Sequence, residues 1–74
     1  MEVKINKKYR HFKGEVIVVL GIGTNTETLG QMVIYMALST GKIWIRPMEM
    51  FTSEVDHEKY PEVEQIYRFE EVVE

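Results

Sequence analysis

The stretch EVIVVLGIGT at residues 15–24 restricts the fold more than any other part of this chain. β-Branched residues crowd it, and such residues favour strands because their stiff side chains pack well on a pleated surface. Its apolar run is continuous, which predicts burial on both faces or a long bent strand shared by two halves of a sheet. Gly21 and Gly23 would allow such a bend or a bulge. We therefore expect the fold to be built around this strand.

Two hairpins are predicted along the first two thirds of the chain. Residues 9–12 form a short strand that Lys13-Gly14 links tightly to the central strand. Strands at residues 31–38 and 43–46 are expected to pair through the turn Ser-Thr-Gly-Lys between them.

The secondary structure of the last third of the chain is predicted from its prolines, its polar loop and its alternating residues. Pro47 lacks a backbone N–H, so it should lie at a strand end or on a sheet edge. Residues 48–51 would then turn a short corner and place apolar side chains on the core. After a polar loop, the alternation within residues 62–69 indicates a final strand, and residues 70–74 are expected to fray.

The predicted fold class is all-β, with residues 1–74 forming a single domain. About five short strands would form a small SH3-like barrel or a curled antiparallel sheet. The alternative is an α+β fold with a helix near residues 27–38, because Thr24 and Glu27 have the spacing of a capping box. A helix would also place several apolar residues on one face, because their spacing is three to four residues; these are Leu29, Met32, Val33, Met36 and Ala37.

Charge is distributed unevenly along a chain whose net charge is −3. Basic residues concentrate in residues 1–14 and acidic residues in residues 48–74, so the N-terminal strand should lie beside the C-terminal segment. Nonspecific nucleic-acid binding needs a concentrated positive surface, and we do not expect it of this acidic chain.

Composition also bears on location and cofactors. The absence of cysteine excludes disulfides and thiolate metal sites and fits a reducing compartment. The first residues contain no apolar signal sequence, and the longest apolar run, residues 32–38, is too short to span a bilayer. We expect a cytoplasmic protein without a membrane contact. His57 lies in an acidic loop, but two distant histidines are poor evidence for a metal site, and neither a metal nor a cofactor is predicted.

Several short motifs together are similar to a known family. They are YRHFKG at residues 9–14, VLGI at 19–22, TET at 26–28, VIY at 33–35, WIRP at 44–47 with MF at 50–51, and YRFE at 67–70. In order and spacing they resemble the small bacterial domain of unknown function (DUF) family 1653. The resemblance covers roughly residues 8–70 and implies a short single-domain protein, sometimes appended to other domains, with no assigned activity or catalytic residues.

Two residues depart from what the resemblance leads us to expect. Gly23 stands where alanine is expected, and Met36 stands where a polar residue is commoner. If Met36 replaces an outward polar group, then Val33, Tyr35 and Ala37 face the core, which supports a strand here.

Aromatic and cationic residues are the best candidates for a ligand site. Trp44 and Arg46 alternate with two isoleucines, so they share one face of a strand. The rings could form the floor of a groove in which Arg46 clamps a carboxylate or phosphate. Alternatively, Trp44 pairs with Tyr35 across a hairpin, and Arg46 stacks on the indole or pairs with a glutamate. The candidate ligand-binding residues are Tyr9, His11, Glu27, Tyr35, Trp44, Arg46 and Glu49.

Three functions are compatible with these residues. The first is a noncatalytic binding module that recognises a peptide or other ligand through the Trp44/Arg46 face. The second is a small hydrolase or transferase that uses His11 with Glu27 or Glu49. The third is a homodimeric interaction protein that uses sheet edges and the exposed methionines Met32, Met36 and Met48. We prefer the first and expect no catalytic residue, because no recognisable nucleophile motif is present.

Overall fold

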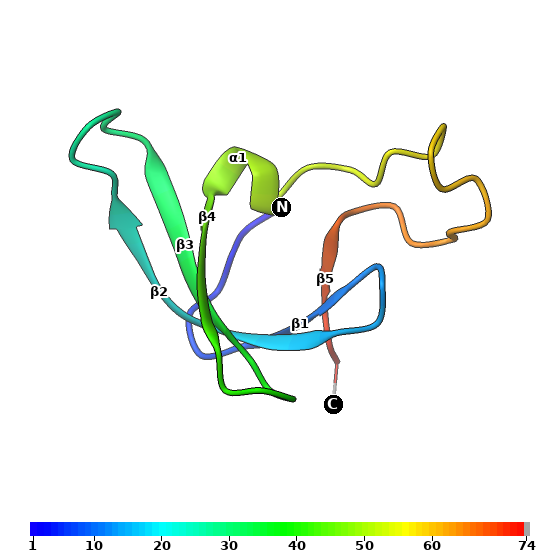
Figure 1. Ribbon diagram of the computed structural model, residues 1–74, viewed down its shortest axis with the longest axis horizontal. Helices are drawn as coiled ribbons and strands as arrows, with labels where there is room; N and C mark the ends of the chain where they lie inside the picture. The colour runs from blue at the N-terminus through cyan, green and yellow to red at the C-terminus, as the bar shows by residue number, and fades with distance from the viewer. Residues whose placement is uncertain (74) are drawn as a thin grey trace.

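A computed structural model describes residues 1–73 as one antiparallel sheet with a one-turn helix (Figure 1). The elements are β1 (Lys8–His11), β2 (Val16–Thr24), β3 (Gln31–Ala37), β4 (Ile43–Pro47), α1 (Met48–Phe51) and β5 (Phe69–Glu71). The strand order is β4-β3-β2-β1-β5, with every neighbouring pair antiparallel. The prediction of a curled antiparallel sheet of five strands is confirmed, and the sheet is not closed. The alternative of a helix near residues 27–38 is wrong, because most of this segment is β3.

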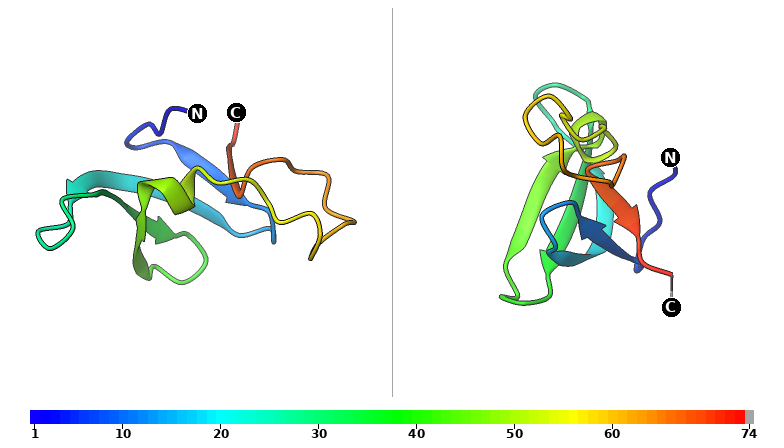
Figure 2. Two further views of the ribbon diagram at one scale, coloured as in Figure 1. Left: turned by 90° about the horizontal axis from the view of Figure 1, so that it is seen from above. Right: turned by 90° about the vertical axis from the view of Figure 1, so that its right-hand side faces the viewer.

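The long strand β2 bends where it was expected to bend. Its register with β3 shifts between Val19 and Gly21, so Leu20 has no partner on β3. Such a bulge increases the local twist of a strand. The sheet curls (Figure 2) until the Phe69 ring of β5 lies 5.6 Å from the Tyr35 ring of β3.

The core lies inside this curl and is mostly aromatic. Phe51 is fully buried, and its ring stacks on that of Phe69 with centroids 4.2 Å apart and planes 5° apart. The predicted corner after Pro47 is confirmed as α1, which brings Phe51 over the sheet. The inward-facing residues of β3 are Val33, Tyr35 and Ala37, as expected from an outward Met36.

The final strand begins later than predicted. Residues 62–69 were expected to form it, but only Phe69–Glu71 pair with β1. The preceding loop makes a single bridge between Glu54 and Tyr67. Residues 62–68 instead form an irregular loop held by other contacts. The Arg68 carbonyl accepts a hydrogen bond from the Phe12 backbone N–H at 3.0 Å, and the Gln65 side chain donates one to the Arg10 carbonyl at 3.0 Å. The expected fraying is wrong for Glu70 and Glu71, and residue 74 lies outside the described residues.

The predicted contact between the basic N-terminal and acidic C-terminal segments is confirmed. Arg10 of β1 lies opposite Glu70 of β5, and Lys4 Nζ is 3.2 Å from Glu71 Oε1. Opposite charges on facing strands favour this pairing.

No helix in the part of the chain that the structure describes is long and apolar enough to cross a membrane.

Gly23 provides a test of the outer face of β2. A Cβ there would lie 3.7 Å from Ile34 Cδ1, an ordinary contact, and the backbone is not in the left-handed region. Gly23→Ala should therefore raise the free energy of unfolding by about 0.4–1 kcal/mol, because alanine restricts the unfolded chain more than glycine does. Urea denaturation followed by circular dichroism measures this change. Gly41→Ala is the matched control and should destabilise, since Gly41 has φ +73°. Destabilisation by Gly23→Ala would contradict the described packing.

Candidate functional site

A cavity of about 340 Å³ opens on the concave side of the curled sheet. We call it the concave pocket. It brings together four of the seven predicted ligand-binding residues, namely His11, Tyr35, Trp44 and Arg46. The other residues that line it are Glu15, Ile17, Ala37, Ser39, Thr40 and Phe69.

The β3–β4 register explains why Trp44 and Arg46 reach this pocket. Tyr35 lies opposite Trp44, and Val33 lies opposite Arg46. Directly opposite residues project to the same face of an antiparallel pair, and Val33 and Tyr35 face the core. The predicted cross-strand pair of Tyr35 and Trp44 is confirmed.

Arg46 is fixed by two contacts with aromatic side chains. Its Nε donates a hydrogen bond to the Tyr35 hydroxyl at 3.2 Å, and its Cζ lies 5.8 Å from the centre of the Phe69 ring. The expectation that Arg46 stacks on the indole or pairs with a glutamate is wrong, because the guanidinium turns toward β3 and β5. The guanidinium is thus held at the pocket wall.

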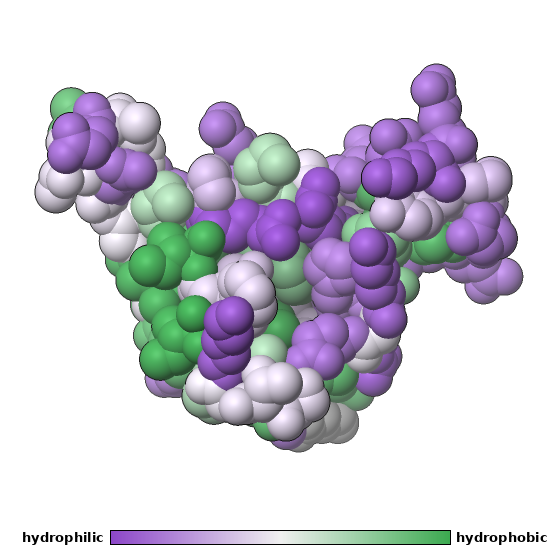
Figure 3. All heavy atoms as spheres, in the orientation of Figure 1, coloured by the Kyte–Doolittle hydropathy of each residue, from purple (hydrophilic) through white to green (hydrophobic). Residues whose placement is uncertain are grey.

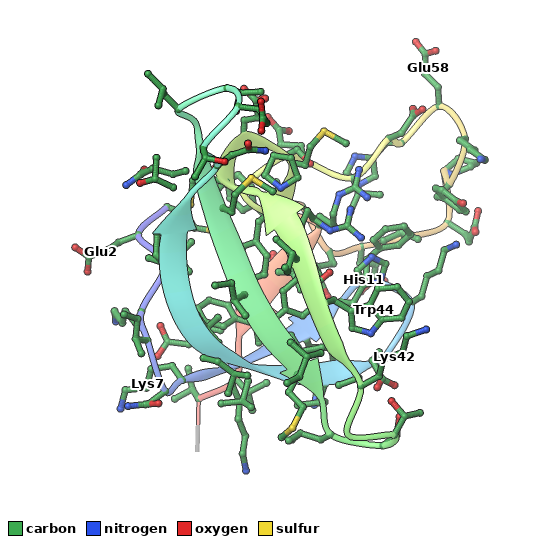
Figure 4. The ribbon with its side chains drawn as sticks, turned by 60° about the vertical axis from the view of Figure 1, so that its left-hand side comes forward. Glu2, Lys7, His11, Lys42, Trp44 and Glu58 are labelled. Atoms are coloured by element: carbon green, nitrogen blue, oxygen red, sulfur yellow. The ribbon has the colours of Figure 1, made fainter. Side chains whose placement is uncertain are left out.

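Trp44 forms another wall of the pocket and remains 46% exposed, whereas Tyr35 opposite it is only 5% exposed. The indole is covered in part by Lys42, whose Nζ lies 4.3 Å from the ring centroid. In Figure 4 the labelled side chains of Trp44 and His11 lie near one another, and both line the pocket. A half-exposed tryptophan beside a cavity is a common feature of binding surfaces.

His11 also lines the pocket, as a neutral imidazole. Its Nδ1 accepts a hydrogen bond from the Lys13 backbone N–H at 3.1 Å, so the proton of the neutral ring is on Nε2. Burial lowers the pKa of His11 to about 4, and the charges of Arg46, Arg68 and Lys13 add to this effect. At neutral pH the ring therefore offers one N–H donor rather than a positive charge.

Glu15 and Ser39 are pocket residues that the sequence analysis missed. The Ser39 hydroxyl donates a hydrogen bond to Glu15 Oε1 at 2.7 Å. Strand alternation contains the signal for both, because Glu15 lies two residues before the inward Ile17 and Ser39 two residues after the inward Ala37. Phe69 was recognised only as a strand residue, because its neighbours in the pocket are distant in sequence.

Three predicted candidates lie outside the pocket. Tyr9 is a core residue, 1% exposed, and its hydroxyl accepts a hydrogen bond from the Lys4 backbone N–H at 2.9 Å. Glu27 lies on the exposed β2–β3 loop. Glu49 belongs to α1 and lines a different hollow together with Asn25 and Met48. Within residues 1–73, no three histidine or acidic side chains gather closely enough to hold a metal ion.

The protonation of His11 can be tested by NMR. We expect its ring to titrate with a midpoint near pH 4 and to show the Nε2–H tautomer at pH 7. Because the unfolded value is 6.5, the unfolded chain binds the proton first, so His11 reduces stability as pH falls from about 6.5 to about 4. His11→Asn keeps an acceptor for the Lys13 N–H and should show a weaker loss of stability over this range. A midpoint near 6.5 would contradict the described environment.

Comparison with known proteins gives a family but no activity. Residues 7–71 match the family described as "Protein of unknown function (DUF1653)". No curated protein matches the chain. No solved structure matches it either. Since the match extends over most of the 74 residues, the chain belongs to the DUF1653 family.

Proposed function

We propose that this protein is a noncatalytic binding module that recognises a peptide or other ligand in the concave pocket. The observation that carries the proposal is the half-exposed Trp44 indole beside a pocket whose floor is buried core. Ile43 and Ile45 are exposed too, but Trp44 is the one tryptophan of the chain and lines the concave pocket, and tryptophan is enriched at binding surfaces.

The composition of the pocket supports binding. Its floor is apolar, formed by Ile17, Ala37 and the ring of Phe69, while polar groups stand at its walls. Binding sites for small ligands commonly combine such surfaces with a few placed polar groups, and about 340 Å³ lies in their usual size range. Arg46 and Glu15 provide groups of opposite charge for orienting a ligand.

The arrangement of polar groups favours binding over catalysis. A general base of the histidine type is usually oriented by a carboxylate, but His11 Nδ1 accepts from a backbone N–H. The cations around His11 stabilise its neutral form and weaken it as a base. A small hydrolase or transferase built on His11 with Glu27 or Glu49 has less support, because neither glutamate lines the pocket.

A second candidate, a homodimer, has support from the opposite face of β4. Ile43 and Ile45 are 58% and 63% exposed, and Figure 3 shows hydrophobic residues gathered on the left-hand side of the molecule. The methionines expected to form this surface are instead half-buried. β4 is also an edge strand, and such edges can pair with a second chain.

The preferred function is tested first by measuring how exposed Trp44 is in solution. Acrylamide should quench the fluorescence of this single tryptophan efficiently, and quenching should not change with protein concentration. Lys42→Ala should increase the quenching, because the lysine covers one face of the ring. Lys59→Ala is the control and should have no effect, since Lys59 lies over Tyr60 instead. Strong protection that disappears on dilution would indicate a dimer that covers the concave pocket instead of the face of Ile43 and Ile45, and protection at every concentration would place the indole in the core. Either result would contradict the preferred function.

Binding itself can be tested with a fragment screen followed by ¹H–¹⁵N NMR. We expect fragment-induced shifts to concentrate on Tyr35, Trp44, Arg46 and Phe69. Trp44→Ala should weaken the binding of such fragments about tenfold, because stacking on the indole is lost. Ile45→Ala on the opposite face of β4 is the matched control and should leave affinity unchanged. Shifts confined to the face of Ile43 and Ile45 would contradict a ligand site in the concave pocket.

A further inference from the structure

Three cations from separate parts of the chain act on the His11 side of the concave pocket: Arg46 lines the pocket, and Lys13 and Arg68 lie outside its lining. Arg46 comes from β4, Lys13 from the β1–β2 turn, and Arg68 directly precedes β5. Each of the three charges acts on the His11 ring. The chain as a whole has more acidic than basic residues, so the local positive potential here is a feature of the fold.

None of these cations has a carboxylate partner within residues 1–73. Arg46 donates to the Tyr35 hydroxyl, and Arg68 Nε donates to Ser53 Oγ at 3.1 Å. Lys13 Nζ lies 5.8 Å and 5.4 Å from the ring centres of Phe12 and Tyr60. The ion pair that the described residues form, Lys4 with Glu71, lies at the end of β5 away from Phe69, the residue opposite His11. Neutral partners leave the positive charge in place, so this side of the pocket attracts anions.

The Arg46 guanidinium is oriented as a donor pair for such an anion. Its contacts within the described residues use Nε and the face of the group. Nη1 and Nη2 therefore keep their N–H groups for a ligand. Two parallel N–H donors match the two oxygens of a carboxylate. Contacts with Tyr35 and Phe69 hold the group in place before a ligand arrives, which lowers the entropy lost on binding.

His11 can add a donor on the same side. The hydrogen bond from Lys13 N–H to Nδ1 leaves the proton on Nε2. The ring packs edge-on against Phe69, with centroids 5.0 Å apart, and Phe69 also lies beneath Arg46. Arg46 and His11 are therefore arranged around one aromatic ring.

Glu15 limits how much negative charge the pocket can accept. Its carboxylate lines the same cavity and accepts the Ser39 hydroxyl. A dianionic phosphate would meet this like charge, whereas a monoanion needs only the Arg46 side of the pocket. The rings of Trp44 and Phe69 would contact an apolar body attached to the anion.

We infer that the concave pocket binds a monocarboxylate with an aromatic or apolar body, its carboxylate held by Arg46 and His11. This inference rests on the proposed binding function and specifies the class of ligand. The anion would face Arg46 from β4, with Lys13 of the turn and Arg68 before β5 as charges outside the pocket lining, and with Glu15, just before β2, as the opposing charge.

The test compares three probes with a phenylalkyl body: 3-phenylpropanoate, its isosteric neutral amide 3-phenylpropanamide, and the longer dianion 3-phenylpropyl phosphate. Each is titrated into the full chain and followed by ¹H–¹⁵N NMR at pH 7. We expect the carboxylate to shift pocket resonances and to bind roughly tenfold or more tightly than the amide, because charge-assisted hydrogen bonds are lost with the amide. The phosphate should bind more weakly than the carboxylate.

Variants assign the effect to the named groups. Arg46→Met keeps a long side chain over Phe69 and should reduce the affinity for 3-phenylpropanoate roughly tenfold or more while leaving amide binding unchanged. His11→Asn should reduce the affinity for 3-phenylpropanoate by a smaller factor. Arg10→Met is the matched control, because Arg10 is an exposed arginine of β1 that does not line the pocket, and it should have no effect.

The outcomes separate this inference from the function on which it rests. If 3-phenylpropanoate and its amide bound the pocket with equal affinity, the inferred recognition of a carboxylate would be wrong. The proposed binding function would still stand. If the phosphate bound more tightly than the carboxylate, the inference that the pocket prefers a monoanion would be wrong. If Arg10→Met weakened binding as much as Arg46→Met does, the affinity would depend on the overall charge of the protein. That result would contradict a specific carboxylate site at Arg46. Failure of all three probes to shift any pocket resonance would overturn this inference, and failure of the wider fragment screen would overturn the binding function too.

Discussion

Stacking of Phe51 on Phe69 gives the open sheet its second layer. A single sheet of five short strands cannot bury an apolar face by itself. The one-turn helix α1 and the three-residue strand β5 each contribute one ring, and the rings stack 4.2 Å apart. The rings of Tyr9 and Tyr35 meet Phe51 edge-on at 5.7 and 5.6 Å. These four aromatic side chains close the curl and hold elements that are distant in sequence.

The concave pocket is a continuation of this aromatic core. Phe69 belongs to the core on one side and lies beneath Arg46 on the other. Tyr35 is buried, but its hydroxyl reaches the guanidinium. The positions of the polar groups in the pocket therefore depend on the same packing that stabilises the fold. Side chains fixed in this way lose little entropy when they bind a ligand, which is how rigid sites gain affinity.

Charge is separated between two sides of the sheet. Where β1 pairs with β5, basic and acidic residues face one another and offset each other's charge. Around His11, the cations contact hydroxyl groups and aromatic rings, and none of them pairs with a carboxylate in the part of the chain that the structure describes. Burial first, and then the positive charges nearby, lower the pKa of His11, so the histidine remains a neutral donor. The same charges motivate the proposal that the pocket binds an anion.

The sequence alone predicted an all-β fold, the β1–β2 and β3–β4 hairpins, the bend in β2 and the corner at α1, but left open whether the sheet closes into a barrel. These features depend on local alternation, on glycine and proline, and on short turns, all of which act between near neighbours. Alternation also placed Trp44, Arg46 and Tyr35 on one face. The start of β5 and the burial of Tyr9 were decided only by tertiary structure. Alternation along β2 and β3 indicates the face of Glu15 and Ser39, but only the curl of the sheet makes a pocket on that face. Each depends on how far the sheet curls and on which rings close it, and no local pattern of residues encodes contacts between segments so distant in sequence.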